Sequence, residues 1–249
     1  MKTKMIFLSK SLLGTALCSL IFMAACQQEM NPLAEQVEKE DLLANAGKIH
    51  NEMISYYYSN RLGGELSPDE KFAELLDLSW EYLDHNGYDS QHIQETRQLI
   101  EEKLSASSLK SVTGDGISID SESLGSQLSE TGIYSKHFQK EVKKILSLAH
   151  KNDDRQIIKE YVNSTFSGLE FNEDDDIAGQ QLFVNIFNGS YDFWEMMNES
   201  QLKSTNLKTS SWVIINDGIG GVLGSIFGPI GSIVVATAFS VATNEEINN

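Results

Sequence analysis

Apolar residues recur at spacings of three to five positions along most of this chain, which is the period of a helix that buries one face. The first run begins after Asn31-Pro32, where a proline suits the first turn of a helix. Its apolar positions are Leu33, Val37, Leu42, Ala46, Ile49, Met53 and Tyr56 or Tyr57. The pattern predicts a helix that ends near Asn60, before Gly63-Gly64.

Two further helices are marked by their ends. Ser67-Pro68-Asp69-Glu70 combines a capping serine, a proline at the first helical position and a glutamate three residues after the cap. Asn86-Gly87 predicts the end of this helix, and Asp89 or Ser90 predicts the start of the next. The residues expected to face inwards are Phe72, Leu75, Leu76 and Leu83, then Ile93, Leu99, Ile100 and Leu104. Residues 31–104 are therefore predicted to form an N-terminal helical region.

The composition changes between residues 105 and 132, which contain nine serines and four glycines but few large apolar side chains. Such a stretch buries too little apolar surface to offset the entropy lost on ordering the backbone. It is predicted to be a linker or a long exposed loop. Val112 to Ile119 is the only short strand candidate in the chain.

Helical spacing resumes over residues 133–209, which are predicted to form a C-terminal helical region. Its apolar positions are Ile133, Phe138, Val142, Ile145, Leu146, Ala149, Ile157, Ile158, Tyr161, Val162, Phe166, Ile177, Leu182, Phe183, Ile186, Phe187, Phe193 and Trp194. Asn172 to Asp176 places negative charge at the start of one of these helices, where the helix dipole favours it. The fold class predicted for the whole chain is all-α, a helical bundle.

The segment 210–244 is apolar and rich in small residues, and a short polar tail, 245–249, follows it. The 26 residues from Gly218 to Thr243 carry no charge. A small residue stands at every fourth position, at Gly220, Gly224, Gly228, Ser232, Ala236 and Ser240. On a helix these positions form one smooth stripe that another backbone can approach closely. This segment resembles the glycine zippers of membrane-spanning and membrane-disrupting helices.

The sequence of this segment is compatible with two structures, a membrane-spanning helix and a buried helical hairpin. Its length of about 39 Å as a helix exceeds a hydrocarbon core of about 30 Å, so it is long enough to span a membrane. Alternatively, Gly228-Pro229 separates two shorter helices, one ending near Phe227 and one beginning at Pro229, in a hairpin buried within the bundle. The stripe also offers a possible surface for self-association or for a protein partner.

The N-terminus has the pattern of a secretory signal peptide. Three lysines precede an uncharged apolar stretch from Ser11 to Ala25 that is too short to span a bilayer comfortably. Met23-Ala24-Ala25-Cys26 at its end resembles the lipobox of bacterial lipoproteins, with Met23 where leucine is usual. The resemblance implies that residues 1–25 are removed, that Cys26 is acylated and that residues 26–30 form a tether. Gln27, where an inner-membrane retention signal would have aspartate, further implies sorting to the outer membrane.

The charge balance limits the partners. The chain has 36 acidic and 19 basic residues, a formal charge of −17, and such a field repels phosphate backbones, so nucleic acid is not expected as a partner. Removal of the three lysines of the leader would make the mature chain more acidic still. On this basis the protein's own surface is expected to give no electrostatic help at an anionic membrane, and the acyl chains on Cys26 would hold it there.

No recognisable catalytic or metal-binding motif is present. The chain lacks a nucleophile elbow, a phosphate-binding loop and a dinucleotide fingerprint. None of the five histidines, His50, His85, His92, His137 and His150, forms an i, i+4 pair. The stretch from Asp84 to Glu95 resembles an EF-hand loop only faintly, because Asp89 stands where glycine is required. Cys18 lies in the leader, so no disulfide is expected, and the sequence predicts no cofactor, no metal and no enzyme activity.

Two polar features of the first predicted helix have more than one interpretation. Tyr56, Tyr57 and Tyr58 could stack on a sugar, although a helix with consecutive tyrosines usually buries one or two of them. His50-Asn51, within Gly47-Lys48-Ile49-His50-Asn51, is a polar pair, with Asn51 expected to bond to a neighbouring loop. Together with the small-residue C-terminus, this stretch resembles uncharacterised helical secreted proteins and lipoproteins of Gram-negative bacteria, a resemblance that implies no activity.

The function predicted from the sequence is that of a lipid-anchored helical protein of the cell envelope with a structural or interaction role. One alternative is a membrane-inserting, toxin-like protein that uses the glycine-zipper segment. A second alternative is a hydrolase or sugar-binding envelope protein whose site has no recognisable motif.

Overall fold

The computed structural model describes residues 32–62, 68–106, 121–151, 154–201 and 211–248. The helices in this part of the chain are α2 (Pro32–Asn60), α3 (Pro68–His85), α4 (Ser90–Ala106), α6 (Ser121–Glu130), α7 (Lys136–Lys151), α8 (Arg155–Tyr161), α9 (Asp174–Gln201), α10 (Ser211–Gly224) and α11 (Gly228–Asn248). A π-helical turn, η1 (Val162–Phe166), continues α8, and a 3-10 turn, η2 (Ser225–Phe227), joins α10 to α11. No strand occurs in these ranges, and the predicted all-α fold class is confirmed.

The chain forms two units, Met1–Glu40 and Asp41–Asn249. The leader, the lipobox and Cys26 lie in the first unit and outside the described residues. Everything below concerns the second unit. The N-terminal and C-terminal helical regions share this unit, because α11 contacts α3 and α4 as well as α10 and α9.

Several helix ends follow the predicted local signals. The α2 helix ends at Asn60, and α3 begins at Pro68. After α3, Gly87 has a φ of +77°, a left-handed conformation that favours glycine. The Asp89 carboxylate then accepts hydrogen bonds from the backbone N–H groups of Gln91 and His92, so Asp89 is the cap of α4.

Among the side chains of α4 that the structure describes, which do not include Leu104, the inward face differs from the prediction at one position. Leu99 is 48% exposed, whereas Thr96 is buried beside Ile93 and Ile100. The i, i+3, i+7 spacing of these three residues places them on one side of the helix, and Leu99 lies outside that stripe.

The serine-rich segment 105–132 is not a loop along its whole length. Ser121–Glu130 forms α6, and Leu124 and Leu128, one helical turn apart, are both fully buried. These two leucines join the core that α7 and α9 share, so tertiary burial stabilises a helix whose composition alone would not. Val112 to Ile119 lies outside the described residues.

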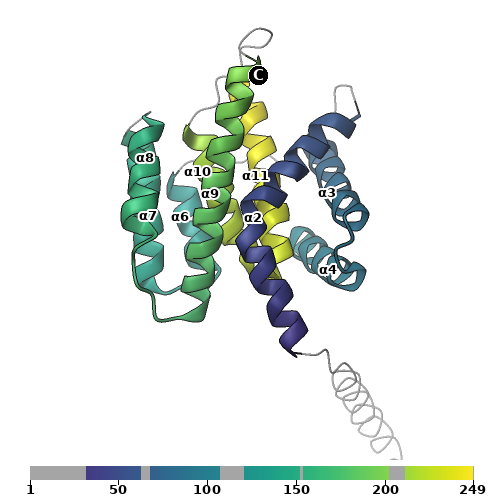
Figure 1. The fold of residues 1–249 in the computed structure, drawn as a ribbon, viewed down its shortest axis with the longest axis horizontal. Helices are drawn as coiled ribbons and strands as arrows, with labels where there is room; N and C mark the ends of the chain where they lie inside the picture. The colour runs from purple at the N-terminus through teal and green to yellow at the C-terminus, as the bar shows by residue number, and fades with distance from the viewer. Residues whose placement is uncertain (1–31, 63–67, 107–120, 152–153, 202–210, 249) are drawn as a thin grey trace, which may run out of the picture. The chain divides into compact units, whose positions relative to one another are not determined.

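The helical hairpin formed by α10 and α11 lies at the centre of the second unit (Figure 1). The α10 helix contacts α6, α7 and α9, whereas α11 contacts α3 and α4. One apolar cluster includes α7, α9 and α10, and a second includes α2, α3, α4 and α11. The hairpin thus supplies one wall of each cluster, which is why the two predicted regions fold as one unit.

Helices α2 and α9 cross at two glycines. A Cβ atom on Gly47 would lie 2.1 Å from the backbone oxygen of Asn185, and one on Gly189 would lie 2.8 Å from the Cα of Gly47. The Asn185 side chain donates to the Leu43 carbonyl at 2.8 Å, and the Asn51 side chain donates to the Gly189 carbonyl at 2.9 Å. Asn51 therefore bonds to a helix backbone and not to the loop that the sequence suggested.

Candidate functional site

The predicted stripe of small residues is folded back on itself. Gly220 and Gly224 lie on α10, whereas Ser232, Ala236 and Ser240 lie on α11. A Cβ atom on Gly220 would lie 2.9 Å from the Ala236 Cα, and one on Gly224 would lie 2.8 Å from the Ser232 Cα. The close backbone approach that the stripe allows therefore takes place within this chain.

Gly228, the remaining member of the stripe, forms the turn. Its φ of +79° and ψ of −177° place it in a region open essentially only to glycine. No atom lies within 4 Å of the position that its Cβ would take, so the backbone angle and not packing requires glycine here. Pro229 follows in the first turn of α11, where its missing N–H is harmless. In this fold the hairpin, one of the two predicted alternatives, is the structure of the segment.

Ser211–Asn244 is the one helical segment in the described part of the chain with the length and composition to cross a membrane. Of its most apolar window, 72% is buried inside the fold. Most of the apolar side chains of this segment are therefore covered by the protein's own helices, with Ile226 at the turn 40% exposed.

A buried polar cluster lies where the open end of the hairpin meets α9 and α2. Asp217 on α10 is 0% exposed, and its Oδ2 accepts hydrogen bonds from the Ser240 hydroxyl at 3.0 Å and the Trp194 indole N–H at 3.4 Å. The Ser190 hydroxyl donates to the same oxygen. Beside them the Asn216 side chain donates to the Thr243 hydroxyl at 3.2 Å. One carboxyl group thus connects α10, α11 and α9.

His50 on α2 completes the cluster. Its Nε2 lies 3.8 Å from the Asp217 Oδ2, both side chains are 0% exposed, and its Nδ1 lies 3.1 Å from the Asn51 Oδ1. Within the described residues, His50 Nε2, Asn216 Oδ1 and Asp217 Oδ1 have no hydrogen-bond partner. The imidazole and the carboxyl group therefore face each other at a distance too long for a hydrogen bond.

Burial keeps both groups uncharged near neutral pH. It raises the pKa of Asp217 to about 8, although hydrogen bonds from Ser190, Ser240 and Trp194 act in the opposite direction. It lowers the pKa of His50 to about 4, although the hydrogen bond with Asn51 acts in the opposite direction. A charge removed from water is disfavoured, so the neutral acid and the neutral imidazole are the stable forms here.

Serine, histidine and aspartate are the residue types of many hydrolases, but their arrangement here differs from a catalytic triad. The Ser190 hydroxyl donates to Asp217 and not to the imidazole, so no base stands ready to accept its proton. Ser190, His50 and Asp217 are each 0% exposed. In this structure the hydrogen bonds of Asp217 link α9, α10 and α11.

Only part of this cluster was visible in the sequence. The sequence indicates His50-Asn51 as a polar pair and Trp194 as an apolar position, but it assigns no role to Asp217 or Ser190. A signal existed, because Asp217 is the only charged residue between Lys208 and Glu245. An isolated acid beside a long uncharged segment indicates either a partner in the core or a functional group.

The other sequence candidates are dispersed. In the described ranges no group of three or more His, Cys, Asp or Glu side chains is arranged to hold a metal ion. Tyr57 is buried, while Tyr56 donates a hydrogen bond to Glu81 and the Tyr58 hydroxyl accepts one from Asn244. The Tyr57 and Tyr58 rings contact each other edge to face, with centroids 5.3 Å apart, so they do not form one flat face for stacking.

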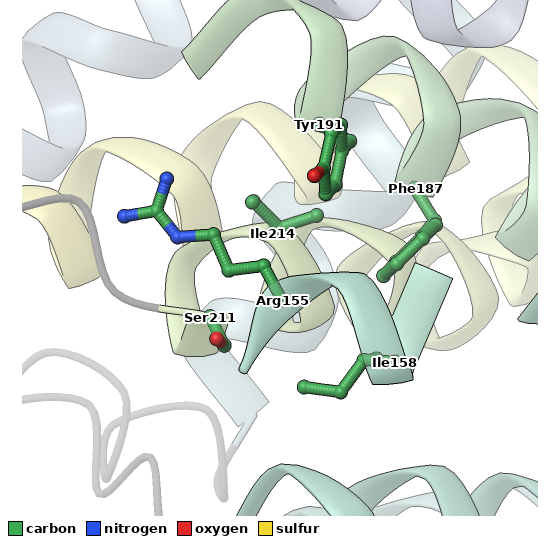
Figure 2. A pocket seen from close by; sticks show the side chains of 6 residues that line it. All are labelled: Arg155, Ile158, Phe187, Tyr191, Ser211 and Ile214. Carbon is green, nitrogen blue, oxygen red and sulfur yellow. The ribbon is translucent and has the colours of Figure 1, made fainter. Parts of the chain in front are cut away.

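A small pocket lies between α8, α9 and α10 (Figure 2). Ile158, Phe187, Tyr191 and Ile214 form its apolar lining, with Arg155 and Ser211 beside them. The hollow has a volume of about 0 Å³ open to a water-sized group, whereas small-molecule sites begin at roughly 300 Å³.

Comparison with known proteins found no matching family model, no similar curated protein and no similar solved structure.

Proposed function

We propose that this protein is a lipid-anchored component of a bacterial cell envelope, held at the membrane through acylated Cys26, with a folded helical body that has an interaction or structural role. The main support for an interaction or structural role of the helical body is the hairpin, because the chain buries its most apolar segment inside itself. The lipobox-like sequence before Cys26 supports the anchor. The body then needs no second membrane attachment.

The lengths of the two arms support this assignment. A membrane-spanning helix needs about 20 apolar residues, but α10 has 14. The apolar part of α11 ends at Thr243, before Asn244 and Glu245, so it is also shorter than a span. While Gly228 keeps the turn, neither arm is long enough to cross a bilayer.

The polar cluster gives a second reason. Asp217, Asn216 and Ser240 all lie on the hairpin, and the partners of Asp217 on α9 would be lost if the hairpin moved into lipid. Asn244, at the end of the apolar segment, donates to the Tyr58 hydroxyl on α2 at 2.8 Å. These bonds favour the hairpin as a permanent core element, since each polar group left unpaired in hydrocarbon costs several kcal/mol.

Two measurements test the proposal. Labelled palmitate should be incorporated into the wild-type protein and not into the Cys26→Ala variant. A chain beginning at Gln27 should be soluble and monomeric in buffer without detergent, by analytical ultracentrifugation. Equal labelling of the two proteins would contradict acylation of Cys26. A strict need for detergent would show that the hairpin belongs in lipid.

A second candidate function, insertion of the hairpin into a bilayer, is favoured by one observation. The segment from Gly218 to Thr243 is uncharged, and its neighbour Asp217 is neutral below a pKa of about 8, so no ion would have to enter the lipid. This is the mechanism of a membrane-disrupting protein.

The hairpin turn allows this candidate to be tested without disturbing the core. Ile226 is 40% exposed, so Ile226→Asp should leave the soluble fold intact. If the turn enters a bilayer, the new charge costs about 3 kcal/mol and should abolish dye release from liposomes. Ile177→Asp, at a residue of similar exposure on α9, is the matched control. A wild-type protein that releases no dye would eliminate the candidate.

A further inference from the structure

Helix α7 differs in charge from the rest of the chain. It contains five lysines, Lys136, Lys140, Lys143, Lys144 and Lys151, and a single acidic residue, Glu141. Its net charge is therefore +4 within a chain of net −17. A strongly acidic protein thus concentrates positive charge on one helix of 16 residues.

The lysines share one face of the helix. Phe138, Val142, Ile145, Leu146 and Ala149 are buried and form the opposite face, with Glu141 at its edge. At about 100° per residue, the five lysines fall within an arc of roughly 100° centred opposite the buried face. They extend along about 22 Å of the helix. We call these five residues the lysine face.

Most of this charge is available to a partner. All five lysines are exposed. Lys144 forms an ion pair with Glu141 at 2.7 Å, and Lys143 donates to the Ser129 hydroxyl at 3.2 Å. No described residue forms an ion pair or hydrogen bond with Lys136, Lys140 or Lys151. Three ammonium groups on the lysine face therefore lack a counter-charge in the described part of the chain.

We propose that the lysine face binds the anionic surface of a lipid bilayer. A row of flexible ammonium groups on the exposed side of an amphipathic helix suits the phosphates of a headgroup layer, where each lysine contributes favourable binding energy. The proposal rests on the proposed function, because acylated Cys26 would keep the body close to a bilayer and raise the effective concentration of that surface. The acidic helices would be repelled by the same surface, so the contact also orients the body.

The lysine face differs from what the net charge of the chain alone predicts. A total of −17 suggests that the protein's own surface gives no electrostatic help at a membrane. The structure separates the charges, however, and electrostatic attraction at short range depends on the face presented within a Debye length of about 10 Å, not on the total charge.

The test uses the chain beginning at Gln27, which contains the whole compact unit 41–249, and therefore does not depend on acylation. Cosedimentation is measured with vesicles of phosphatidylcholine alone and with vesicles containing phosphatidylglycerol. Binding is expected only to the anionic vesicles at about 50 mM salt, and it should be lost near 500 mM. The triple variant Lys136→Gln, Lys140→Gln, Lys151→Gln should bind about 100-fold more weakly.

A control of equal charge change distinguishes the lysine face from net charge. Lys48→Gln, Arg61→Gln, Lys71→Gln removes three positive charges from other helices and their ends and should bind like the wild type. Equal loss in both triple variants would overturn the proposal, as would absence of binding at low salt. Binding to neutral vesicles that resists salt would overturn it in favour of hairpin insertion. A dimer that only the α7 variant disrupts, without vesicle binding, would assign the lysine face to a second copy of the chain.

Palmitate labelling and the vesicle assay separate the two proposals. Binding of anionic vesicles through α7 by a protein that is not acylated would contradict the lipid anchor and support membrane binding by the lysine face. Acylation without binding to anionic vesicles would support the lipid anchor and contradict membrane binding by the lysine face.

Discussion

At the scale of single residues, Asp217 and His50 make folding sensitive to pH in opposite directions. Asp217 binds its proton more tightly in the folded state, because its pKa is raised from 3.8 to about 8. Its contribution to the free energy of unfolding is therefore complete below pH 3.8 and is lost as the pH rises through about 8. The lowered pKa of His50 stabilises the folded protein above pH 6.5, and this contribution is lost as the pH falls through about 4. Between pH 4 and 6.5 the two effects cancel, because the folded state holds one proton on Asp217 and the unfolded state holds one on His50.

Above pH 6.5 His50 becomes neutral in the unfolded state as well as in the folded state, so the pH dependence comes mainly from Asp217. The free energy of unfolding should therefore fall as the pH rises. From pH 6.5 to 8 the free energy of unfolding is expected to decrease by about 1 kcal/mol. Urea denaturation of the chain beginning at Gln27, followed by circular dichroism at several pH values, measures this change.

Asp217→Asn is the control for that prediction. An asparagine oxygen still accepts the hydrogen bonds from Ser240, Trp194 and Ser190, but the side chain does not titrate. Its stability should be nearly constant between pH 6.5 and 8. A decrease as large as that of the wild type would show that another group causes the pH dependence.

At the scale of elements, the crossing of α2 and α9 depends on Gly47. Gly47→Ala would place a methyl group 2.1 Å from the Asn185 backbone oxygen, so the helices must move apart. The expected loss in free energy of unfolding is about 3 kcal/mol or more. Thermal and urea unfolding measure it.

Gly125→Ala provides the comparison for this crossing. Gly125 lies on α6, and its added methyl group would meet only the flexible Lys143 side chain of α7. Alanine also favours a helix by up to about 1 kcal/mol over glycine. Gly125→Ala should therefore be neutral or stabilising. If both variants behaved alike, the close crossing would be contradicted.

The turn of the hairpin depends on backbone conformation alone. Gly228→Ala creates no clash, since nothing lies within 4 Å, but it forces a non-glycine residue to φ +79°. The expected cost is about 1–3 kcal/mol. Equilibrium unfolding of this variant measures the cost, and unchanged stability would be incompatible with the hairpin turn.

At the scale of the whole molecule, burial of the hairpin can be measured by cysteine labelling. The chain beginning at Gln27 contains no cysteine, so single cysteine substitutions report cleanly. Ile226→Cys, at the exposed turn, should react quickly with a maleimide. Ser232→Cys, at a position that is 0% exposed, should react only when the protein is denatured. Rapid reaction at both positions would place the hairpin outside the core.

The sequence predicted the elements better than it predicted their contacts. The ends of α2, α3 and α4 follow from capping groups, proline and glycine, which act on their immediate neighbours. α6 was missed because its stability comes from burial of Leu124 and Leu128 in a core that distant residues build. The polar cluster was missed for the same reason, since His50, Ser190 and Asp217 are brought together from three helices.

What the sequence by itself determined is local: the helical period, the helix ends, the leader-like N-terminus, and a long uncharged segment with a small residue at every fourth position. Backbone propensity, capping and hydrophobic spacing act over a few residues, so they can be read along the chain. Only the tertiary structure decided that this segment folds at Gly228, so that Gly220 packs on Ala236 and Gly224 on Ser232. It also decided that Asp217 is buried, which raises its pKa to about 8. Burial and the distances between charges depend on which segments lie against each other, and no spacing within one segment contains that information.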